Sequence, residues 1–244
     1  MSSLKDKVAI VTGASRGIGR SIAERLAQEG AAVVVNYCKS ADKAQEVVRG
    51  IEEKGGHALA IQADVSKVSD IRRLFQQIMG HYERIDIVVA NAGMFNPKSV
   101  VDTTEEEFDA MVALNTKSVF FTLQEAGRHI TDGGRIIYIS TSATASSYPG
   151  SAVYKGTKAA GEHFITTLAH ELGPRQVTVN TVSPGFTETD MLPKDEALRE
   201  TGRQMSPLRR LGQPIDIAHV VAFLASEEGG WITGDNIQAS GGIT

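Results

Sequence analysis

Tyr154 and Lys158 place a phenol and an ammonium group four residues apart. On a helix, that spacing puts both side chains on one face. A phenol ordinarily has a pKa of about 10, and a fixed ammonium nearby favours the phenolate and lowers that pKa. The pair can therefore act as a general acid and base near neutral pH. In isolation this spacing is more often a surface tyrosine with an unrelated lysine, so the rest of the chain must supply the context.

A glycine-rich turn near the start of the chain has the context of a dinucleotide-binding loop. Residues 7–12 are apolar and rich in β-branched side chains, which predicts a buried strand, and a helical pattern begins at residue 18. Between them, Gly13 permits a tight turn, Gly17 lets the backbone approach a pyrophosphate, and Gly19 lets the helix pack closely on the strand. The start of the helix would then present free N–H groups and the positive end of its dipole to the phosphates.

These two motifs together resemble the short-chain dehydrogenase/reductase family, and the resemblance extends from Lys7 to Gly242. The glycine spacing is T-G-x-x-x-G-x-G rather than the G-x-G-x-x-G of the larger dehydrogenases. Within the family, the chain is similar to 3-oxoacyl-acyl-carrier-protein reductases and to aldehyde and ketone reductases. Other stretches that match the family are Asp64-Val65, Asn91-Ala92-Gly93, Asn115, Pro184-Gly185, Gly234 and Gly241-Gly242.

Apolar runs alternate with helical patterns along the whole chain. This alternation predicts a parallel sheet with helices on both faces, whose strands read as continuously apolar. Because no linker or repeat interrupts it, we predict a single α/β domain over residues 1–244, a Rossmann-type doubly wound fold with a central parallel sheet of about seven strands. The predicted strands are 8–11, 32–36, 58–62, 85–89, 135–139, 178–182 and 232–238, and the predicted helices are 18–29, 41–54, 68–81, 104–115, 118–130, 153–172 and 214–225.

Several helix ends also carry local signals. Thr103 or Thr104 followed by Glu107 predicts a helix start of the capping-box type. Gly30 and the pair Gly55-Gly56 predict helix stops, because glycine readily adopts the left-handed conformation that ends many helices.

The stretch 186–213 interrupts the alternation. It is polar, contains Pro193 and Pro207 and shows no clear strand. A long insertion after a late strand of an α/β sheet often covers the site, so we predict a substrate lid over 186–213. Ligands of parallel sheets bind beyond the carboxyl ends of the strands. Motif residues that directly follow apolar runs, and so support one shared site, are Gly13, Asp64, Asn91, Ser140 and Pro184.

Composition and charge argue against other classes of protein. The net charge is −4 without a long basic run, so we expect no nucleic-acid partner. No apolar run approaches the ~18 residues of a membrane span, and the first residues lack a signal-peptide core, so we expect no membrane association. The single Cys38 fits a reducing, cytoplasmic location. The six His residues show no metal-ligand spacing, so no metal site is predicted.

The end of the second predicted strand indicates which dinucleotide binds. An Asp or Glu there would bond the ribose 2′-hydroxyl of NAD, but the strand ends V-N-Y-C-K-S and no acid appears before Asp42. Asn36 and Ser40 can donate hydrogen bonds to a 2′-phosphate, and Arg16 and Lys39 can add positive charge. We therefore predict NADP(H) as cofactor; the alternative is that the two cations are solvated surface charges.

The resemblance implies further cofactor contacts. Asp64-Val65 resembles the adenine contact, although Asp64 also suits a helix cap and both roles can coexist. Asn91-Ala92-Gly93 resembles a turn close to the cofactor, with Ala90 where Asn is more usual, and Pro184-Gly185 with Thr187 resembles the contact with the nicotinamide amide. The predicted cofactor-binding residues are Gly13, Ser15, Arg16, Gly17, Ile18, Gly19, Asn36, Tyr37, Lys39, Ser40, Asp64, Val65, Asn91, Ala92, Gly93, Asn115, Tyr154, Lys158, Pro184, Gly185 and Thr187.

The resemblance also implies catalytic roles. Tyr154 is the proton donor to a carbonyl during reduction and the base during alcohol oxidation. Lys158 lowers the pKa of that phenol and bonds the nicotinamide ribose, and Asn115 holds a water that links Lys158 to solvent. The predicted reaction is the interconversion of a carbonyl and a primary or secondary alcohol by hydride transfer, in which the protein supplies orientation and the cofactor supplies the hydride.

A hydroxyl that orients the substrate carbonyl completes this set. The usual family spacing, thirteen residues before the tyrosine, places Thr141 where Ser is common. Thr can donate the same hydrogen bond, with a stiffer side chain. A small change of register would bring in Ser142 or Ser140, and we predict that the Thr141/Ser142 pair supplies the hydroxyl without choosing between them.

Two alternative functions remain open. A 3-oxoacyl-acyl-carrier-protein reductase shares the fold and cofactor, but Asp132 has the wrong sign for an acidic carrier, which leaves Arg128 and Arg175 as basic candidates. A non-catalytic NADP-binding regulator should have lost Tyr154 or Lys158, and both are present. The predicted substrate pocket is mostly apolar and consists of Met94, Phe95, Ala143, Tyr148, Phe186, Met191 and Leu192.

Members of the family usually pair long helices into dimers and then tetramers, so we predict a homo-oligomer. The helices predicted over 104–130 and 153–172 suit that role, and the stretch that begins at Trp231 is a second candidate contact. The alternative for the helices is ordinary core packing. Their candidate interface residues are Phe120, Phe121, Phe164 and Leu168.

Overall fold

Seven parallel strands form a central sheet in the order β3-β2-β1-β4-β5-β6-β7. The structure is a computed structural model and describes residues 4–146 and 148–244. The predicted α/β fold and its sheet of about seven strands are confirmed. The strands are β1 (Val8–Val11), β2 (Ala32–Tyr37), β3 (His57–Gln62), β4 (Ile85–Ala90), β5 (Ile130–Ile139), β6 (Thr178–Pro184) and β7 (Asn236–Ala239).

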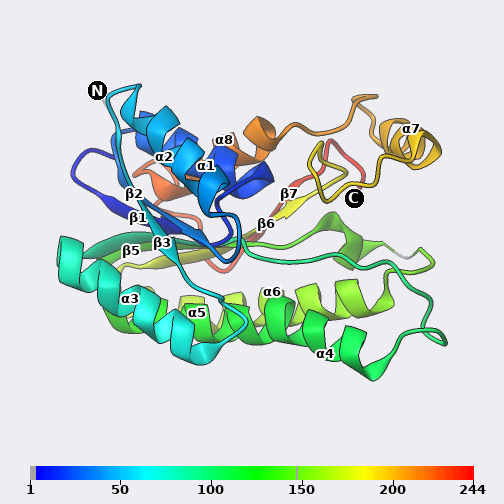
Figure 1. Cartoon of the computed structure of the whole chain (residues 1–244), viewed down its shortest axis with the longest axis horizontal. Helices are drawn as coiled ribbons and strands as arrows, with labels where there is room; N and C mark the ends of the chain where they lie inside the picture. Colours follow the sequence, from blue (N-terminus) through cyan, green and yellow to red (C-terminus); the bar gives the residue numbers. More distant parts are fainter. Residues whose placement is uncertain (1–3, 147) are drawn as a thin grey trace.

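Helices connect the strands and cover both faces of the sheet (Figure 1). They are α1 (Gly17–Gln28), α2 (Ala41–Glu52), α3 (Val68–Tyr82), α4 (Glu105–Val112), α5 (Ser118–His129), α6 (Ala152–Leu172), α7 (Glu196–Met205) and α8 (Pro214–Ala225), with short helical turns η1 (Ala113–Lys117), η2 (Ser142–Ala145) and η3 (Gly173–Arg175). One face carries α1, α2 and α8, and the other carries α3, α5 and α6, each with its own apolar cluster. The chain reverses its direction of winding between β1 and β4, which is where such sheets bind ligands.

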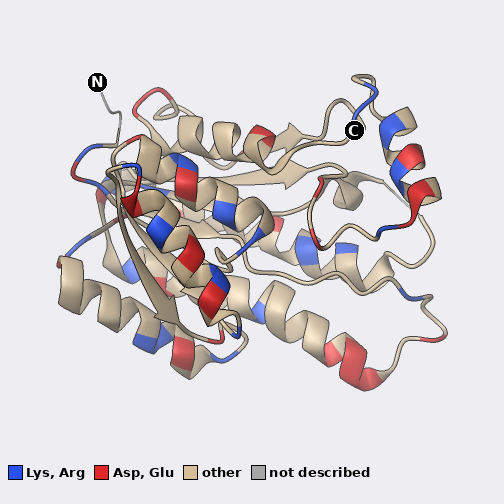
Figure 2. Cartoon of the chain, turned by 45° about the horizontal axis from the view of Figure 1, so that its top comes forward, with Lys and Arg blue, Asp and Glu red and all other residues tan. Residues whose placement is uncertain are grey.

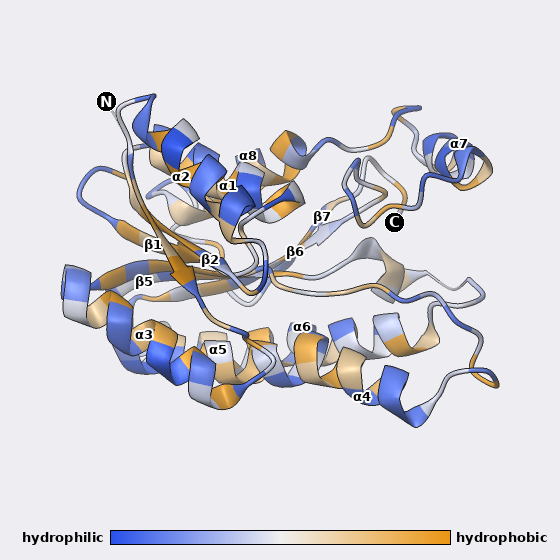
Figure 3. Ribbon diagram, in the orientation of Figure 1, coloured by the Kyte–Doolittle hydropathy of each residue, from blue (hydrophilic) through white to orange (hydrophobic). Residues whose placement is uncertain are grey.

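The strands are apolar because helices exclude water from both of their faces. All residues of β1 and β4 are buried, and the strands stand out as hydrophobic in Figure 3. The surrounding helices are amphipathic and turn their polar sides outward. The core therefore lies in two layers, and the loops at the carboxyl edge of the sheet stay free to carry polar side chains.

The predicted helix ends are confirmed in detail. Thr104 caps α4: its side chain accepts from the Glu107 N–H (3.3 Å), and the Glu107 carboxylate accepts from the Thr104 N–H (3.0 Å). Gly30 (φ +99°) follows α1 and Gly55 (φ +79°) follows α2, and both adopt the positive φ that favours glycine.

Several predicted elements differ from the structure. The strand predicted over 135–139 starts earlier, because β5 covers Ile130–Ile139. The last strand covers Asn236–Ala239 rather than 232–238, because a turn with Gly234 at φ +73° occupies the start of the predicted range. The helices predicted over 104–115 and 118–130 are joined without a break by η1, a π-turn that inserts one residue into the helix. This insertion is where Asn115 lies.

The stretch 186–213 contains a helix that the sequence did not indicate. α7 presents alternating basic and acidic side chains (Figure 2), and Arg203 pairs with Glu196 and Glu200 at 2.7 and 2.9 Å. The signals that could have indicated α7 are its many good helix formers and Asp195, whose side chain accepts from the N–H groups of Ala197 and Leu198 at its start. The two ends of the stretch meet, because Gly212 donates to the carbonyl of Phe186 (2.8 Å) and accepts from the N–H of Glu188 (2.9 Å).

Of the four residues considered for a subunit interface, three pack in the core. Phe121, Phe164 and Leu168 lie against the apolar cluster beneath α5 and α6, as the core-packing alternative required. Only Phe120 remains substantially exposed, at 45%. Its ring stands edge-on to that of Phe164, with 5.3 Å between centroids.

Candidate active site

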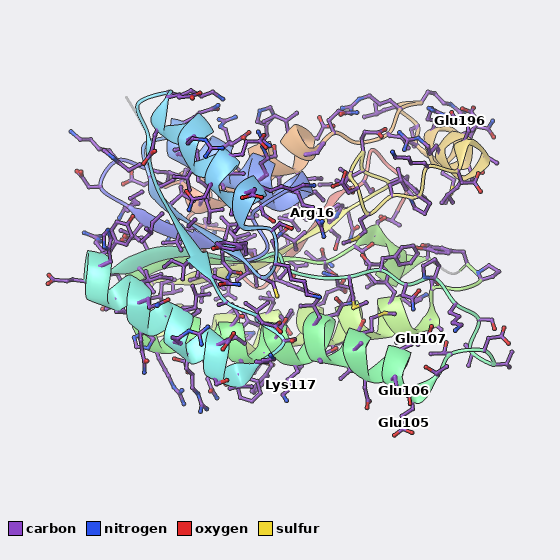
Figure 4. The ribbon with its side chains drawn as sticks, viewed as in Figure 1. Arg16, Glu105, Glu106, Glu107, Lys117 and Glu196 are labelled. Carbon is purple, nitrogen blue, oxygen red and sulfur yellow. The ribbon has the colours of Figure 1, made fainter. Side chains whose placement is uncertain are left out.

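The loop between β1 and α1 has the geometry of an anion-binding turn. Gly13 and Gly17 have φ angles of +64° and +56°, which favour glycine. A Cβ on Gly19 would lie 2.5 Å from Nδ2 of Asn91 and 2.6 Å from the carbonyl oxygen of Gly13, so the close approach of α1 to the sheet requires glycine. Arg16 precedes α1 without capping it, and Figure 4 shows it at the end of α1 nearest the carboxyl edge of the sheet. The backbone fits a pyrophosphate at the helix start.

Thr12, which was not among the predicted site residues, ties this loop to the next one. Its Oγ1 accepts hydrogen bonds from the N–H groups of Asn91 (2.9 Å) and Ala92 (3.0 Å), and Nδ2 of Asn91 donates to the Thr12 carbonyl (2.8 Å). A Cβ on Gly93 would lie 3.1 Å from Nζ of Lys158, so the N-A-G turn also approaches the catalytic face of α6. The only sequence signal for Thr12 was its place at the head of the glycine motif.

The residues that follow β2 offer a second anion site beside the first. The two loops adjoin, because the Ala14 N–H donates to the carbonyl at the end of β2 (2.8 Å). Lys39 is exposed, as is Arg16, which forms no ion pair within the described residues. Ser40 precedes α2, yet its hydroxyl makes no capping hydrogen bond. A hydroxyl, two cations and the start of a helix suit a phosphate, as predicted for NADP(H).

Asn36 does not contribute its side chain to that site. The residue is 1% exposed. Its Oδ1 accepts from the Gly13 N–H (3.2 Å), and its Nδ2 donates to the carbonyls of Ile61 (3.3 Å) and Ala63 (3.2 Å). The prediction that Asn36 donates directly to a 2′-phosphate is therefore wrong, because both of its N–H donors are already bonded inside the sheet. Its observed contacts hold the glycine loop instead.

Asp64 forms a turn before α3 and pairs with a neighbouring lysine. Its Oδ1 accepts from the N–H (3.1 Å) and Oγ (2.7 Å) of Ser66 just before α3. The hydroxyl of Ser66 is the main reason that the pKa of Asp64 lies below its ordinary value. Val65 is buried beside it. The sequence suggested Asp64 as a helix cap, but the N-cap of α3 is Lys67, and Asp64 instead forms the turn just before it. Its Oδ2 lies 3.7 Å from Nζ of Lys67.

Asn115 joins three segments of the site. The π-turn brings its fully buried side chain to Met94, where Oδ1 accepts from the N–H (2.8 Å) and Nδ2 donates to the carbonyl (2.9 Å). Nδ2 also donates to Oγ1 of Thr157 (3.2 Å), next to Lys158 on α6. Asn115 is therefore no solvent-facing helical residue, and it fixes the loop after β4 to the helix that carries Tyr154.

Lys158 is buried, and its ammonium is held by backbone and aromatic groups. Nζ donates to the carbonyl of Ile139 (2.8 Å) and lies 5.2 Å from the ring centroid of Tyr138. The phenol of Tyr138 in turn donates to the backbone carbonyl of Lys158 (3.2 Å). Burial lowers the pKa of Lys158 to about 8, and the carboxylate of Glu162 opposes that shift. Neither Tyr138 nor Glu162 belongs to the motifs that pointed to this site.

Tyr154 lies one turn before Lys158, as predicted, but its pKa is raised rather than lowered. Burial raises the pKa of Tyr154 to about 12, while a hydrogen bond with Thr141 opposes the shift. The expected lowering by Lys158 is absent because Nζ is directed to the Ile139 carbonyl, so burial dominates. At neutral pH the phenol is therefore protonated, which is the state that a proton donor needs.

The three hydroxyls after β5 have different partners. The Thr141 side chain reaches Tyr154 and also accepts from the Ala143 N–H (3.2 Å). Ser142 is buried in η2. Ser140 donates to Oε1 of Glu162 (2.5 Å). Of the predicted pair, Thr141 is the hydroxyl that stands beside the phenol, at the position that the family spacing indicated.

The segment after β6 closes the site from the other side. Pro184 ends β6, and a Cβ on Gly185 would lie 2.8 Å from the carbonyl oxygen of Ser240, so this turn also needs glycine. Oγ1 of Thr187 donates back to the Gly185 carbonyl (2.9 Å). A Cβ on Gly17 would lie 3.4 Å from Cγ2 of Thr189, so the start of the predicted lid lies over the glycine loop.

The predicted substrate residues differ in exposure. Phe95 stands edge-on to Tyr154, with 4.8 Å between ring centroids and 67° between planes. Ala143 is buried, whereas Tyr148 and Met191 are 37% and 48% exposed. Phe95 is thus the predicted pocket residue that directly contacts a catalytic side chain. The remaining predicted residues, Met94, Phe186 and Leu192, are partly buried.

Two features are absent from the described residues. No group of three or more His, Cys, Asp or Glu residues there could hold a metal ion. No helix in the same part of the chain is both long and apolar enough to cross a bilayer.

Comparison with known proteins identifies the class of protein. Residues 13–244 match a family model described as enoyl-(acyl carrier protein) reductase. Elsinochrome reductase 1 of Elsinoe fawcettii is 46% identical, covering 96% of this chain and 92% of its own. Tetrahydroxynaphthalene reductase of Pyricularia oryzae is 41% identical, covering 99% and 90%. A short-chain dehydrogenase from Burkholderia cenocepacia in complex with NADP has a TM-score of 0.95 at 40% identity, with 99% of each chain covered. The angucycline C-6 ketoreductase LanV with bound NADP has a TM-score of 0.95 at 41% identity, covering 99% and 97%.

These similarities extend over nearly the whole length of both chains, at identities well above those that show a fold alone. The chain therefore belongs to the short-chain dehydrogenase/reductase family. The members named above are three reductases and one short-chain dehydrogenase, and the predicted family and oxidoreductase class are confirmed.

Proposed function

We propose that the protein reduces the ketone of an aromatic compound with NADPH, and that Tyr154 donates the proton. As a member of its family, the protein is an oxidoreductase that interconverts a carbonyl and an alcohol, and its cofactor is NADP(H). The observation that carries the assignment of Tyr154 is its position one turn of α6 before the buried Lys158, with the Thr141 side chain beside its phenol.

The chain's own residues supply orientation and a proton. Thr141 donates to the substrate carbonyl oxygen, which polarises it, and the protonated phenol of Tyr154 delivers a proton to the same oxygen as negative charge develops there. Lys158 bonds the nicotinamide ribose. Bound NADPH supplies the hydride that reaches the carbonyl carbon. The raised pKa of Tyr154 keeps the phenol protonated at neutral pH, which is the form that donates a proton in reduction.

Preference for NADPH rests on the residues after β2. Arg16 and Lys39 supply positive charge and the uncapped Ser40 supplies a hydroxyl for the 2′-phosphate, whereas an NAD-preferring site would place a carboxylate there. Tyr37 borders the same loop. The adenine contact of Asp64 and Val65, and the nicotinamide contact of Pro184, Gly185 and Thr187, complete the proposed cofactor site.

An aromatic substrate is supported by the wall of the pocket. Phe95 and Tyr154 already meet edge-to-face, so a planar ring placed against them adds aromatic contact area. The names of two relatives agree: one acts on tetrahydroxynaphthalene, a fused aromatic ring, and the other is a ketoreductase. The stretch 186–213, anchored at both ends, is the proposed lid over that ring.

Arg128 and Arg175 do not support a role as a 3-oxoacyl-acyl-carrier-protein reductase, because both are paired with carboxylates of this chain. Arg175 pairs with Asp132 (2.8 Å), and Arg128 pairs with Glu125 (2.7 Å). Both lie around the start of β5, at the edge of the sheet opposite the site. A 3-oxoacyl thioester therefore serves as a comparison substrate in the test.

We also propose a cytoplasmic homo-oligomer. Cys38 is a free, exposed thiol, which suits a reducing compartment. Apolar side chains are exposed on two separate surfaces. One, the α4–α6 surface, borders an open groove of about 630 Å³ and includes Val100 (71% exposed) and Phe108 (48%). The other, the α8 surface, includes Phe223 (42%) and Trp231 (98%).

The test compares the wild type with Tyr154→Phe on 1-tetralone, cyclohexanone and a 3-oxoacyl thioester, with NADPH and with NADH. We expect 1-tetralone to give the highest kcat/KM with NADPH, roughly fivefold above cyclohexanone, since one aromatic contact contributes ~1 kcal/mol. Tyr154→Phe should lower kcat by at least 10²-fold while NADPH still quenches protein fluorescence. Activity retained by Tyr154→Phe would contradict the proton-donor role, and a higher rate with the thioester would favour the carrier-protein alternative.

A further inference from the structure

Glu162 is a carboxylate at the centre of the site with no role in the reaction described above. It lies on α6 one turn beyond Lys158, so Tyr154, Lys158 and Glu162 share one face of the helix at successive i, i+4 positions. Its side chain is turned inward and only partly exposed. A carboxylate in that position needs donors, and its donors come from the segment that bears Thr141.

Two hydroxyls reach Glu162 from either side of Thr141. Ser140, directly after β5, donates to Oε1 at 2.5 Å, and Thr144, in η2, donates to the same oxygen at 2.9 Å. Thr144 also contacts the carbonyl of Thr141 at 3.0 Å. The Glu162 carboxylate therefore accepts hydrogen bonds from both ends of the segment 140–144, in which Thr141 lies beside Tyr154.

The same carboxylate is the counter-charge of the buried ammonium. In the described part of the chain Glu162 and Lys158 form no direct ion pair, and they interact through space along one helical turn. The other titratable groups around this cluster are phenols, Tyr154 on α6, Tyr138 on β5 and Tyr148 in the loop before α6. Asn115 on η1 is polar but uncharged. Glu162 is thus the one carboxylate among the described residues that acts on Lys158.

We propose that Glu162 is a positioning residue that keeps Lys158 charged and holds Thr141 beside Tyr154. The inference rests on the roles proposed above for Tyr154 and Lys158. Glu162 would thus be a fourth polar group of the site, placed behind Tyr154, Lys158 and Thr141. Because burial disfavours the ammonium and Glu162 opposes that effect, loss of the carboxylate should let Lys158 lose its proton at lower pH.

Glu162→Gln separates the effect of the negative charge on Lys158 from the hydrogen bonds that hold the segment around Thr141. Glutamine keeps an acceptor oxygen for Ser140 and Thr144 but removes the charge. Glu162→Asp keeps the charge on a shorter side chain, and Glu171→Gln, an exposed position on the same helix, is the matched control. Two quantities are measured from pH 6 to 10: kcat/KM for ketone reduction, and the affinity for NADPH from fluorescence titration, which does not depend on turnover.

We expect Glu162→Gln to move the alkaline limb of both profiles by about one pH unit toward acid. Glu162→Asp and Glu171→Gln should leave both limbs in place, although Glu162→Asp should lower kcat through a displaced Thr141. If the limbs of Glu162→Gln coincide with those of the wild type, the counter-charge role is wrong. If Glu162→Gln does not fold, the test rests on Glu162→Asp, which keeps the negative charge. A shift of the alkaline limb of either profile in Glu162→Asp would then overturn the proposal. The two proposals can fail separately. If NADPH binding by Glu162→Gln shifts with pH while Tyr154→Phe keeps normal turnover, the role of Glu162 is upheld and the proton-donor role of Tyr154 is rejected.

Discussion

Asn36 shows how one buried amide can look like a ligand group in a sequence. Its Oδ1 positions the Gly13 N–H and its Nδ2 bonds two carbonyls, so the side chain needs both an acceptor and donors. An aspartate of the same shape would place a carboxylate against the Ile61 and Ala63 carbonyls, with no donor to offer them. An acid at the end of this strand would indicate NAD in a sequence, but the structure predicts that Asn36→Asp damages the sheet.

We therefore expect Asn36→Asp to lower the free energy of unfolding by about 1–3 kcal/mol at pH 7, the usual penalty for leaving buried polar groups unsatisfied. Urea denaturation measures this directly. Arg16→Ala, at an exposed position without an ion-pair partner among the described residues, is the comparison: it should keep stability and raise KM for NADPH. A stable Asn36→Asp variant that prefers NADH would refute the structural role and restore the direct contact.

Residues of the site could be predicted where a short spacing on one element defines them. Tyr154 and Lys158 share a helical face whatever surrounds that helix, and glycines in a strand–turn–helix context have few other uses. Glu162 and Tyr138 could not be found in this way, because their partners come from different elements and a carboxylate on an amphipathic helix is usually solvated. The raised pKa of Tyr154 was missed because it depends on burial, which no spacing reports.

At the scale of the elements, α7 packs through a glycine. A Cβ on Gly202 would lie 2.9 Å from Cγ of Phe186 and 3.0 Å from Cδ2 of Leu211, which lie near the two ends of the stretch 186–213. Arg199 pairs with Glu188 across the same contact. The alternation of strands and helices was predictable from apolar runs, but α7 was not, since it is held by these contacts rather than by an apolar face of its own.

Gly202→Ala tests this packing, and Gly50→Ala is its control; the two should change the stability of the protein in opposite directions. Gly202→Ala should destabilise the protein by about 1–3 kcal/mol and raise KM for the ketone, because the methyl group pushes α7 away from Phe186. Gly50→Ala in α2, where a Cβ meets nothing within 4 Å, should stabilise it by about 0.5–1 kcal/mol. Thermal unfolding and substrate kinetics measure both. Stabilisation by Gly202→Ala would show that α7 does not pack as described.

At the scale of the whole molecule, two exposed apolar surfaces predict how copies assemble. Phe120 extends the α4–α6 surface, and Trp231 dominates the α8 surface. If the α4–α6 surface and the α8 surface are each buried against another copy of the chain, the protein is a tetramer. We expect Phe120→Glu and Trp231→Glu each to give dimers, and the double variant to give monomers, because a charge buried at an interface is strongly unfavourable. Light scattering after gel filtration measures the mass. A monomeric wild type would reject both interfaces.

Cys38 gives the molecule a built-in place for a probe. It is the chain's one cysteine, it is exposed, and it stands between Tyr37 and Lys39 in the loop proposed to hold the 2′-phosphate. A maleimide fluorophore would therefore attach at a single known atom, with no engineered residue. Partial burial, and then the nearby Asp64, raise the pKa of this thiol, so labelling should accelerate as the pH rises. The attached dye would report cofactor arrival at the adenosine end while Tyr154 and the ketone stay untouched.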